Sequence, residues 1–216
     1  MQLKDKKIVI VGDSITEGCG TTEYAKSYPA VLEKLSGATI YNYGIGGTRY
    51  AYQREEYQEN FSESFSERIH RIKEDPDLIL IFGGTNDFGH GDAPFGCFED
   101  RTPHTYCGAC HYIYSNLLEK YPNARIVVLT PLHRVSENNR VKEIRNIPTF
   151  PLEAYVKAQI EIARYYSLPV IDLFSISGMQ PAIKSIREKY MPDGLHPSNE
   201  GARVLAEIIY AQLCCL

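Results

Sequence analysis

Short apolar runs rich in Val and Ile alternate along this chain with segments whose apolar residues recur every three or four positions. A continuous apolar run predicts a strand covered on both faces of its sheet, whereas the wider spacing predicts an amphipathic helix. The predicted strands are 7–11, 39–43, 78–82, 125–129 and 169–173. The predicted helices are 29–35, 112–118, 152–165 and a closing helix whose buried face contains Val204, Leu205, Ile208, Ile209 and Leu213.

Strands separated by helices in this way form parallel βαβ units with right-handed crossovers. We therefore predict a flavodoxin-like three-layer α/β/α sandwich around a five-stranded parallel sheet, with the strand order 2-1-3-4-5. No repeat or change of composition divides the chain, and 216 residues suit a single core. Residues 1–216 are therefore expected to form one domain.

Two segments have a less regular pattern. Residues 54–77 are rich in charge but contain apolar residues at helical spacing, which predicts a surface helix with one apolar stripe. The stripe and its candidate N-caps are Phe61, Phe65, Ile69 and Ile72, preceded by Asn60 or Ser62. Residues 88–110 show no period, and a loop of this length is typical of a lid or a binding loop.

Glycine-rich polar turns follow the first three predicted strands. They are Gly12-Asp13-Ser14, Gly44-Ile45-Gly46-Gly47 and Gly83-Gly84-Thr85-Asn86-Asp87. In open parallel sheets, ligands bind beyond the carboxyl ends of the strands, where the strand order reverses. Each turn alone is an ordinary loop sequence, but together they would meet in one crevice, which indicates a functional site.

The residues at this crevice suit acyl transfer. A serine at the start of a helix, such as Ser14, lies close to backbone N–H groups that favour developing negative charge. The Gly47 N–H and the Asn86 amide could complete an oxyanion hole. A serine hydroxyl needs a base, and His196, which precedes the closing helix, is the candidate, with Asp193 to orient its imidazole. The alternative is that this segment is a simple turn in which Asp193 or Ser198 caps the helix.

These blocks resemble those of the SGNH/GDSL hydrolase family. The matching segments are Val11-Gly12-Asp13-Ser14-Ile15-Thr16-Glu17-Gly18, Asn42-Tyr43-Gly44-Ile45-Gly46-Gly47, Gly84-Thr85-Asn86-Asp87 and Asp193-Gly194-Leu195-His196-Pro197. The resemblance implies a Ser14 nucleophile with His196 and Asp193 as triad partners, and Gly47 and Asn86 as oxyanion donors. It implies no metal and no organic cofactor. Ile15 replaces the leucine of the family name, and Gly44 and Gly46 offer competing registers for the oxyanion glycine.

The leading hypothesis is hydrolysis of a short-chain ester, such as an acetyl group on a sugar. A lysophospholipase or acyltransferase of the same fold is the first alternative, and Phe88, Phe95 and Phe98 could then line an apolar trough for the acyl chain. A phosphate- or nucleotide-binding module is the second alternative. It would leave Asp193 and His196 unexplained, and the chain contains neither a Walker lysine nor a GxGxxG motif.

Composition and charge argue against some classes of partner. A net charge of −4 argues against nucleic acid as a partner, and an apolar fraction of 44% is ordinary for a globular protein. No apolar run reaches the length of a membrane span, and the N-terminus does not resemble a signal peptide, so we expect a cytoplasmic protein. The substrate would be a small-molecule or carbohydrate ester; the sequence leaves the ester and the oligomeric state open.

Two further groups of residues could carry chemistry. The six cysteines are expected to be mostly reduced, and the single CxxC pair, Cys107 and Cys110, lacks the second pair of a structural zinc site. We therefore expect Gly108 and Ala109 to open a closely packed helix. Arg49, His133 and Arg134 follow the second and fourth predicted strands and are candidates to select an anionic or polar substrate group.

Overall fold

The computed structural model describes residues 2–54, 63–142 and 148–216 and contains a five-stranded parallel sheet in the order β2-β1-β3-β4-β5. The strands are β1 (Lys7–Gly12), β2 (Thr39–Gly44), β3 (Leu78–Phe82), β4 (Arg125–Leu129) and β5 (Val170–Ile171). In the register of the sheet, Gly12 lies beside both Gly44 and Phe82. The ends of three strands are therefore level, and the predicted fold class and strand order are confirmed.

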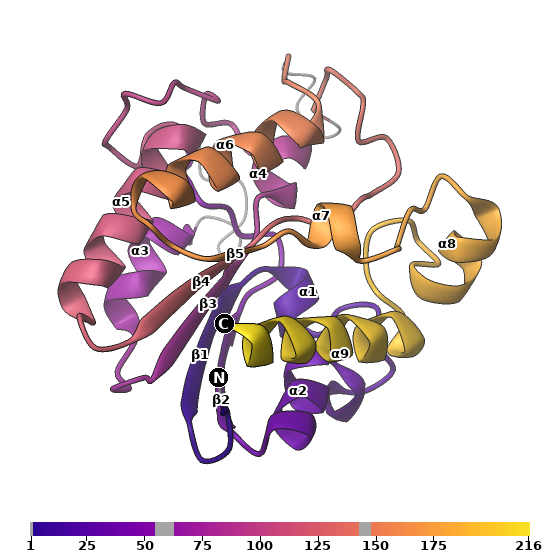
Figure 1. The fold of residues 1–216 in the computed structure, drawn as a ribbon. Coiled ribbons are helices and arrows are strands. Elements are labelled where there is room, and N and C mark those ends of the chain that lie inside the picture. Colours follow the sequence, from indigo (N-terminus) through magenta and orange to yellow (C-terminus); the bar gives the residue numbers. More distant parts are fainter. Residues whose placement is uncertain (1, 55–62, 143–147) are drawn as a thin grey trace.

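Helices cover both faces of the sheet (Figure 1). One layer contains α2 (Tyr28–Ser36) and α9 (Asn199–Cys215), and the other contains α3 (Phe65–Arg68), α5 (Tyr106–Lys120) and α6 (Leu152–Tyr165). Successive residues of β1 face opposite layers. Val9 and Val11 pack in the core beneath α5 and α6, whereas Ile8 and Ile10 pack in the core beneath α2 and α9. This burial on both faces explains the continuous apolar sequence of the strand.

Short helices lie at the carboxyl edge of the sheet. The helices α1 (Ser14–Glu17), α4 (Thr85–Gly89) and α7 (Leu173–Ile176) follow β1, β3 and β5 almost directly. The remaining short helices are η1 (Tyr24–Lys26), η2 (Ile69–Arg71) and α8 (Lys184–Tyr190). Within the described ranges, no helix has the length and apolar composition needed to cross a membrane.

The predicted surface helix at 54–77 is wrong in extent and in exposure. Only α3 and η2 are helical among its described residues, and Ser64 is the N-cap. The Ser64 hydroxyl accepts the Glu67 N–H at 3.3 Å and the Glu67 carboxylate accepts the Ser64 N–H at 2.8 Å, a capping box that sets the helix start. Phe65 and Ile69 are buried as predicted, but so is Arg68. The other residues of that prediction, Asn60, Phe61 and Ser62, lie outside the described residues.

The expected loop at 88–110 is shorter than predicted. Phe88 belongs to α4, and α5 begins at Tyr106, where the Thr105 hydroxyl caps the helix by accepting the Gly108 N–H at 3.1 Å. A Cβ atom at Gly108 would lie 2.1 Å from the Thr102 carbonyl oxygen. This glycine therefore lets the preceding loop, rather than the sheet, approach the first turn of α5.

The last strand is also shorter than the predicted 169–173. The Asp172 carboxylate accepts the Thr130 hydroxyl at 2.9 Å, and the Asp172 carbonyl accepts the Ser175 N–H at 3.0 Å. These bonds turn the backbone into α7 after Ile171. A local apolar pattern does not contain this long-range contact with Thr130.

Candidate active site

Ser14 lies where β1 passes into α1. Asp13 is the N-cap of α1, and its carboxylate accepts the Ile15 N–H at 3.0 Å. Ser14 is thus the first helical residue, and its own N–H is not taken by the cap. A Cβ atom at Gly12 would lie 1.9 Å from the Thr16 hydroxyl oxygen, so the tight strand-to-helix turn requires glycine at this position. Ser14 is buried, with 8% of the residue exposed.

Ser14, His196 and Asp193 form one chain of hydrogen bonds, although 182 residues separate the first two. The distance from Ser14 Oγ to His196 Nε2 is 2.9 Å, and that from His196 Nδ1 to Asp193 Oδ2 is 2.6 Å. The second Asp193 oxygen accepts the N–H groups of Leu195 at 2.8 Å and of His196 at 2.7 Å. The turn therefore holds both the carboxylate and the imidazole that faces Ser14.

The electrostatic environment keeps Asp193 ionised. Burial favours its neutral form, but hydrogen bonds from the His196 ring and from the His196 and Leu195 N–H groups outweigh burial and lower the pKa of Asp193. An ionised carboxylate only accepts hydrogen bonds, so it fixes the proton on His196 Nδ1. His196 Nε2 then presents its lone pair to the Ser14 hydroxyl.

The glycine turn after β2 offers one N–H group to the crevice. The Gly44 N–H is bound to Asn42 Oδ1 at 2.8 Å, and the Gly46 N–H is bound to Glu17 Oε2 at 2.9 Å. Gly47 has a φ of 74°, and its N–H makes no hydrogen bond within residues 2–54, 63–142 and 148–216. Of the three competing glycines, Gly47 therefore has the available donor.

Asn86, in the first turn of α4, faces the same loop. One of its amide protons is donated to the Thr48 carbonyl at 3.0 Å, which leaves the second proton of the amide for another acceptor. Asp87 accepts the N–H groups of Tyr50 at 2.9 Å and Ala51 at 3.2 Å. Adjacent residues of α4 thus hold the second part of this loop, residues 48–51. Burial raises the pKa of Asp87 to about 6, although these two N–H groups oppose the rise.

Arg68 was not identified from the sequence, yet its guanidinium connects the elements around the crevice. It donates to the Gly12 carbonyl at 2.9 Å, to the Thr48 hydroxyl at 2.8 Å and to the Tyr43 carbonyl. Burial lowers the pKa of Arg68 to about 10, and nearby Asp13 partly opposes this effect. In the sequence Arg68 is one charge in a charged segment, and nothing in the local pattern distinguishes it from an exposed arginine.

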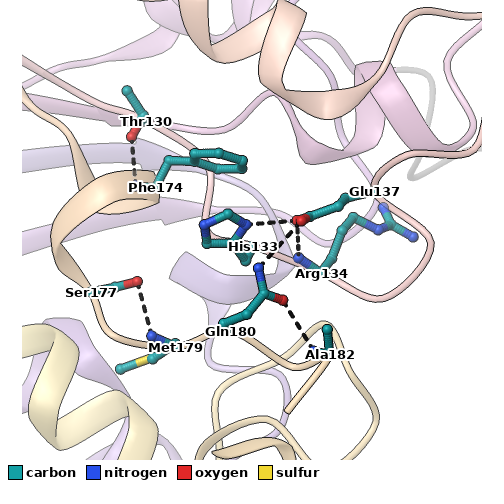
Figure 2. Close-up of polar contacts among 9 residues, drawn as sticks. All are labelled: Thr130, His133, Arg134, Glu137, Phe174, Ser177, Met179, Gln180 and Ala182. Atoms are coloured by element: carbon teal, nitrogen blue, oxygen red, sulfur yellow. Dashed lines mark hydrogen bonds and ion pairs between the residues drawn. The ribbon is translucent and has the colours of Figure 1, made fainter.

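Arg49, His133 and Arg134, which were expected to select a substrate group, differ in how exposed they are. Arg49 and Arg134 are 1% and 5% exposed, and they donate to the Gly47 carbonyl at 3.1 Å and to the Thr85 carbonyl at 3.2 Å. Both therefore brace the loops of the crevice. His133 is partly exposed and pairs with Glu137 at 2.8 Å (Figure 2).

The loop between α4 and α5 forms a cavity, but away from the serine. The cavity has a volume of about 320 Å³ and is lined by Phe95, Phe98 and residues of α6, whereas Phe88 is buried in the core. Its lining, as far as the chain is described, includes neither Ser14 nor His196. Cys107 also lines this cavity. In the ranges that the structure covers, no group of three or more His, Cys, Asp or Glu side chains has the arrangement of a metal site.

Known proteins share this sequence pattern and fold. An acetylxylan esterase of Xylanibacter ruminicola is 23% identical over 220 residues, which cover 96% of this chain and 43% of that protein. This chain therefore spans less than half the length of that relative. A crystal structure of a Lactobacillus plantarum protein is 27% identical, with a TM-score of 0.84 and coverage of 99% of this chain and 98% of that one. A carbohydrate acetylesterase family member from Sinorhizobium meliloti, 19% identical with a TM-score of 0.66, covers 97% of this chain and 98% of its own, and shares the fold.

The sequence profile of the GDSL-like lipase/acylhydrolase family matches residues 10–204, which include Ser14, Asn86 and His196. The match extends through the sheet and into the closing helix. The matched range contains all four of the blocks named from the sequence. This chain therefore belongs to the GDSL-like lipase/acylhydrolase family of ester hydrolases.

Proposed function

We propose that this protein hydrolyses short-chain carboxylic esters, with O-acetyl groups of carbohydrates as the substrate class, through a Ser14–His196–Asp193 triad. The observation that carries the proposal is the continuous hydrogen-bond chain from Ser14 Oγ through the imidazole to the Asp193 carboxylate. Such a chain supplies the base that a serine hydroxyl needs to become a nucleophile.

The reaction begins when Ser14 Oγ attacks the ester carbonyl and its proton passes to His196 Nε2. Asp193 stabilises the imidazolium that forms. The negative charge on the carbonyl oxygen is met by the N–H groups of Ser14 and Gly47 and by the second amide proton of Asn86. His196 then gives its proton to the departing alcohol, which leaves an acyl group on Ser14. Water, activated by the same imidazole, releases the acid and restores the serine.

The acyl specificity is inferred from two observations. The relative from Xylanibacter ruminicola is named an acetylxylan esterase, which points to acetyl esters of a sugar polymer. The apolar cavity near Phe95 and Phe98 has neither Ser14 nor His196 in its described lining, so it offers no direct continuation for a long acyl chain on the serine. The same cavity is also the feature that would favour a lysophospholipase or acyltransferase, if a long chain reached it.

Fluorophosphonate labelling of the wild type and of Ser14→Ala tests the nucleophile. We expect labelling of the wild type alone, and a loss of several orders of magnitude in ester turnover in the variant, because triad members act as a unit. Ser175→Ala is a matched control, since Ser175 is an exposed serine at the same edge of the sheet. Equal labelling of the Ser14→Ala variant and the wild type would refute the assignment.

A panel of nitrophenyl esters from acetyl to palmitoyl tests the acyl length. The proposal predicts the highest kcat/KM for acetyl and a steady decline with longer chains. A maximum at long chains would replace the acetylesterase proposal with the lysophospholipase alternative.

A further inference from the structure

A second carboxylate–imidazole pair lies at the same edge of the sheet as the triad. His133 follows β4, and its Nδ1 lies 2.8 Å from Glu137 Oε2 (Figure 2). The side chains are 21% and 16% exposed. A pair buried to this degree contributes little to stability, because desolvation offsets the attraction of the charges. The presence of the pair is therefore weak evidence for a role in stability.

Glu137 holds the imidazole in one orientation. The oxygen that faces His133 also accepts the Arg134 N–H at 3.2 Å, and the other oxygen accepts the Gln180 side-chain amide at 3.3 Å. Gln180 is fixed in turn, because its carbonyl oxygen accepts the Ala182 N–H at 3.0 Å. An ionised carboxylate can only accept, so the proton of the neutral imidazole lies on Nδ1. His133 Nε2 is then a hydrogen-bond acceptor.

The rest of the His133 side chain is held by an aromatic contact. The ring of Phe174, in the first turn of α7, lies 3.7 Å from the imidazole centroid at an interplanar angle of 35°. His133 Nε2 makes no hydrogen bond to any described residue, and it is not a buried atom. A ring nitrogen held in one orientation is therefore accessible at the surface.

The loop that carries His133 is joined to the turn that carries Asp193 and His196. The Val135 N–H donates to the Gly194 carbonyl at 2.9 Å, and a Cβ atom on Gly194 would lie 2.5 Å from the Val135 side chain. Two residues of extended chain span at most about 7 Å. His133 is therefore two residues away from the backbone bond that joins its loop to the turn carrying Asp193 and His196.

The backbone of this loop is strained. Ser136 has a φ of 61°, in the left-handed region that residues other than glycine rarely adopt. The strained residue lies between Val135, bound to the catalytic turn, and Glu137, bound to His133. Strain of this kind persists only where the surroundings impose it, and it is concentrated at functional sites.

We propose that His133 Nε2, backed by Phe174 and Gln180, accepts a hydrogen bond from a free hydroxyl group on the alcohol part of the ester. The preferred substrates are then esters of polyols and sugars rather than of simple alcohols or phenols. This inference rests on the proposed function, because it assigns the leaving-group side of the same site. In its neutral form Nε2 accepts a hydrogen bond from a hydroxyl, whereas an ionised carboxylate has no proton to donate to it.

The test compares two acetate esters that differ in the alcohol. One is 4-nitrophenyl acetate, whose leaving group has no free hydroxyl, and the other is a monoacetylated methyl xyloside. His133→Phe keeps a ring against Phe174 but removes the acceptor. We expect kcat/KM for the acetylated xyloside to fall about tenfold, the effect of one hydrogen bond, and that for the aryl acetate to stay within about twofold. His133→Gln, whose amide oxygen can accept, should recover most of the loss.

The matched control is His70→Phe, since His70 is a surface histidine whose ring also contacts an aromatic residue, Tyr112. It should change neither substrate. Equal losses on both esters in His133→Phe would show a structural role and overturn the inference, as would no loss on either. Wild type that cleaves the aryl ester but not the acetylated xyloside would also overturn it.

A binding measurement distinguishes failure of this inference from failure of the proposed function. Calorimetric titration of the Ser14→Ala protein with the acetylated xyloside needs no turnover. We expect the affinity to fall about tenfold when His133→Phe is added, and an unchanged affinity would overturn the inference. If the wild type cleaves neither ester while this binding difference is observed, the proposed hydrolysis fails and the hydroxyl-binding site stands.

Discussion

Replacing Arg68 by lysine should weaken both the fold and the oxyanion hole. The guanidinium donates to the Gly12 carbonyl, the Tyr43 carbonyl and the Thr48 hydroxyl, and so it joins β1, β2 and the glycine loop. Lysine keeps the positive charge beside Asp13, but its ammonium is a compact donor that cannot span acceptors so widely separated. Arg68→Lys therefore tests the geometry of the contact rather than its charge.

The magnitude follows from the lost contacts. If lysine retains one of the three hydrogen bonds, two bonds to a charged donor are lost, at about 1.5 kcal/mol each or more. A loss of about 3 kcal/mol corresponds to a fall in Tm of about 6–12 °C for a chain of this size. Because Thr48 adjoins Gly47, loosening the loop should also lower kcat about tenfold with little change in KM, as expected for a contact made in the transition state.

The assay is a thermal melt together with steady-state kinetics on 4-nitrophenyl acetate, measured well below the Tm of the variant. Arg71→Lys is the matched control, since Arg71 lies three residues along the same segment with its side chain 56% exposed and paired with Glu63 at 2.8 Å. An exposed pair contributes little, so the control should move Tm by no more than about 2 °C. Arg68→Lys with the Tm and kcat of the wild type would refute the reasoning.

Three other substitutions have defined outcomes. Asn86→Ala should lower kcat about 10²–10³-fold with little effect on KM, and unchanged kinetics would place the oxyanion donor elsewhere. Burial raises the pKa of Asp13 to about 6, so the folded state binds this proton more tightly than the unfolded state. The resulting stabilisation is present at low pH and is lost as pH rises from about 4 through 6. In urea unfolding, the free energy of unfolding of Asp13→Asn should therefore rise by about 2–3 kcal/mol relative to that of the wild type between pH 4 and 7. A difference between the two proteins that does not change with pH would contradict the raised pKa. Gly194→Ala should destabilise the fold more than Gly178→Ala and should also reduce kcat. Both glycines have positive φ, but only at Gly194 would an added Cβ meet a neighbour, the Val135 side chain at 2.5 Å. Equal effects of the two substitutions on Tm would show that the Val135 contact is unimportant.

Much of the fold could be predicted because its determinants are local. Strands 78–82 and 125–129 and helix 152–165 occur at the predicted residues, since each has a continuous or periodic apolar pattern that burial requires. Strand β5 and helix α3 were predicted too long. Their ends depend on the hydrogen bond between Asp172 and Thr130 and on the capping box of Ser64, and neither changes the apolar pattern.

The residues of the candidate site also differ in whether the sequence could identify them. Ser14, Asn86, Asp193 and His196 could be named because each occurs in a short motif next to a predicted strand or helix. Arg68 could not, because a buried arginine and an exposed one look alike in a charged segment. Its role is visible only when Gly12 and Tyr43, which belong to different strands, are brought to the same place.

The sequence by itself determined the apolar strands, their α/β arrangement and the residue types of an acyl-transfer site, because these depend on neighbouring positions. Only the tertiary structure shows that the Gly46 N–H is already bonded, because its acceptor, Glu17, is distant in the chain. Asn42, two residues away, accepts the Gly44 N–H and Glu17 accepts the Gly46 N–H, so that among the described residues the Gly47 N–H has no partner. Glu17 lies 29 residues from Gly46 in the chain. The state of the Gly46 N–H therefore depends on a contact of that range, and no local pattern contains it.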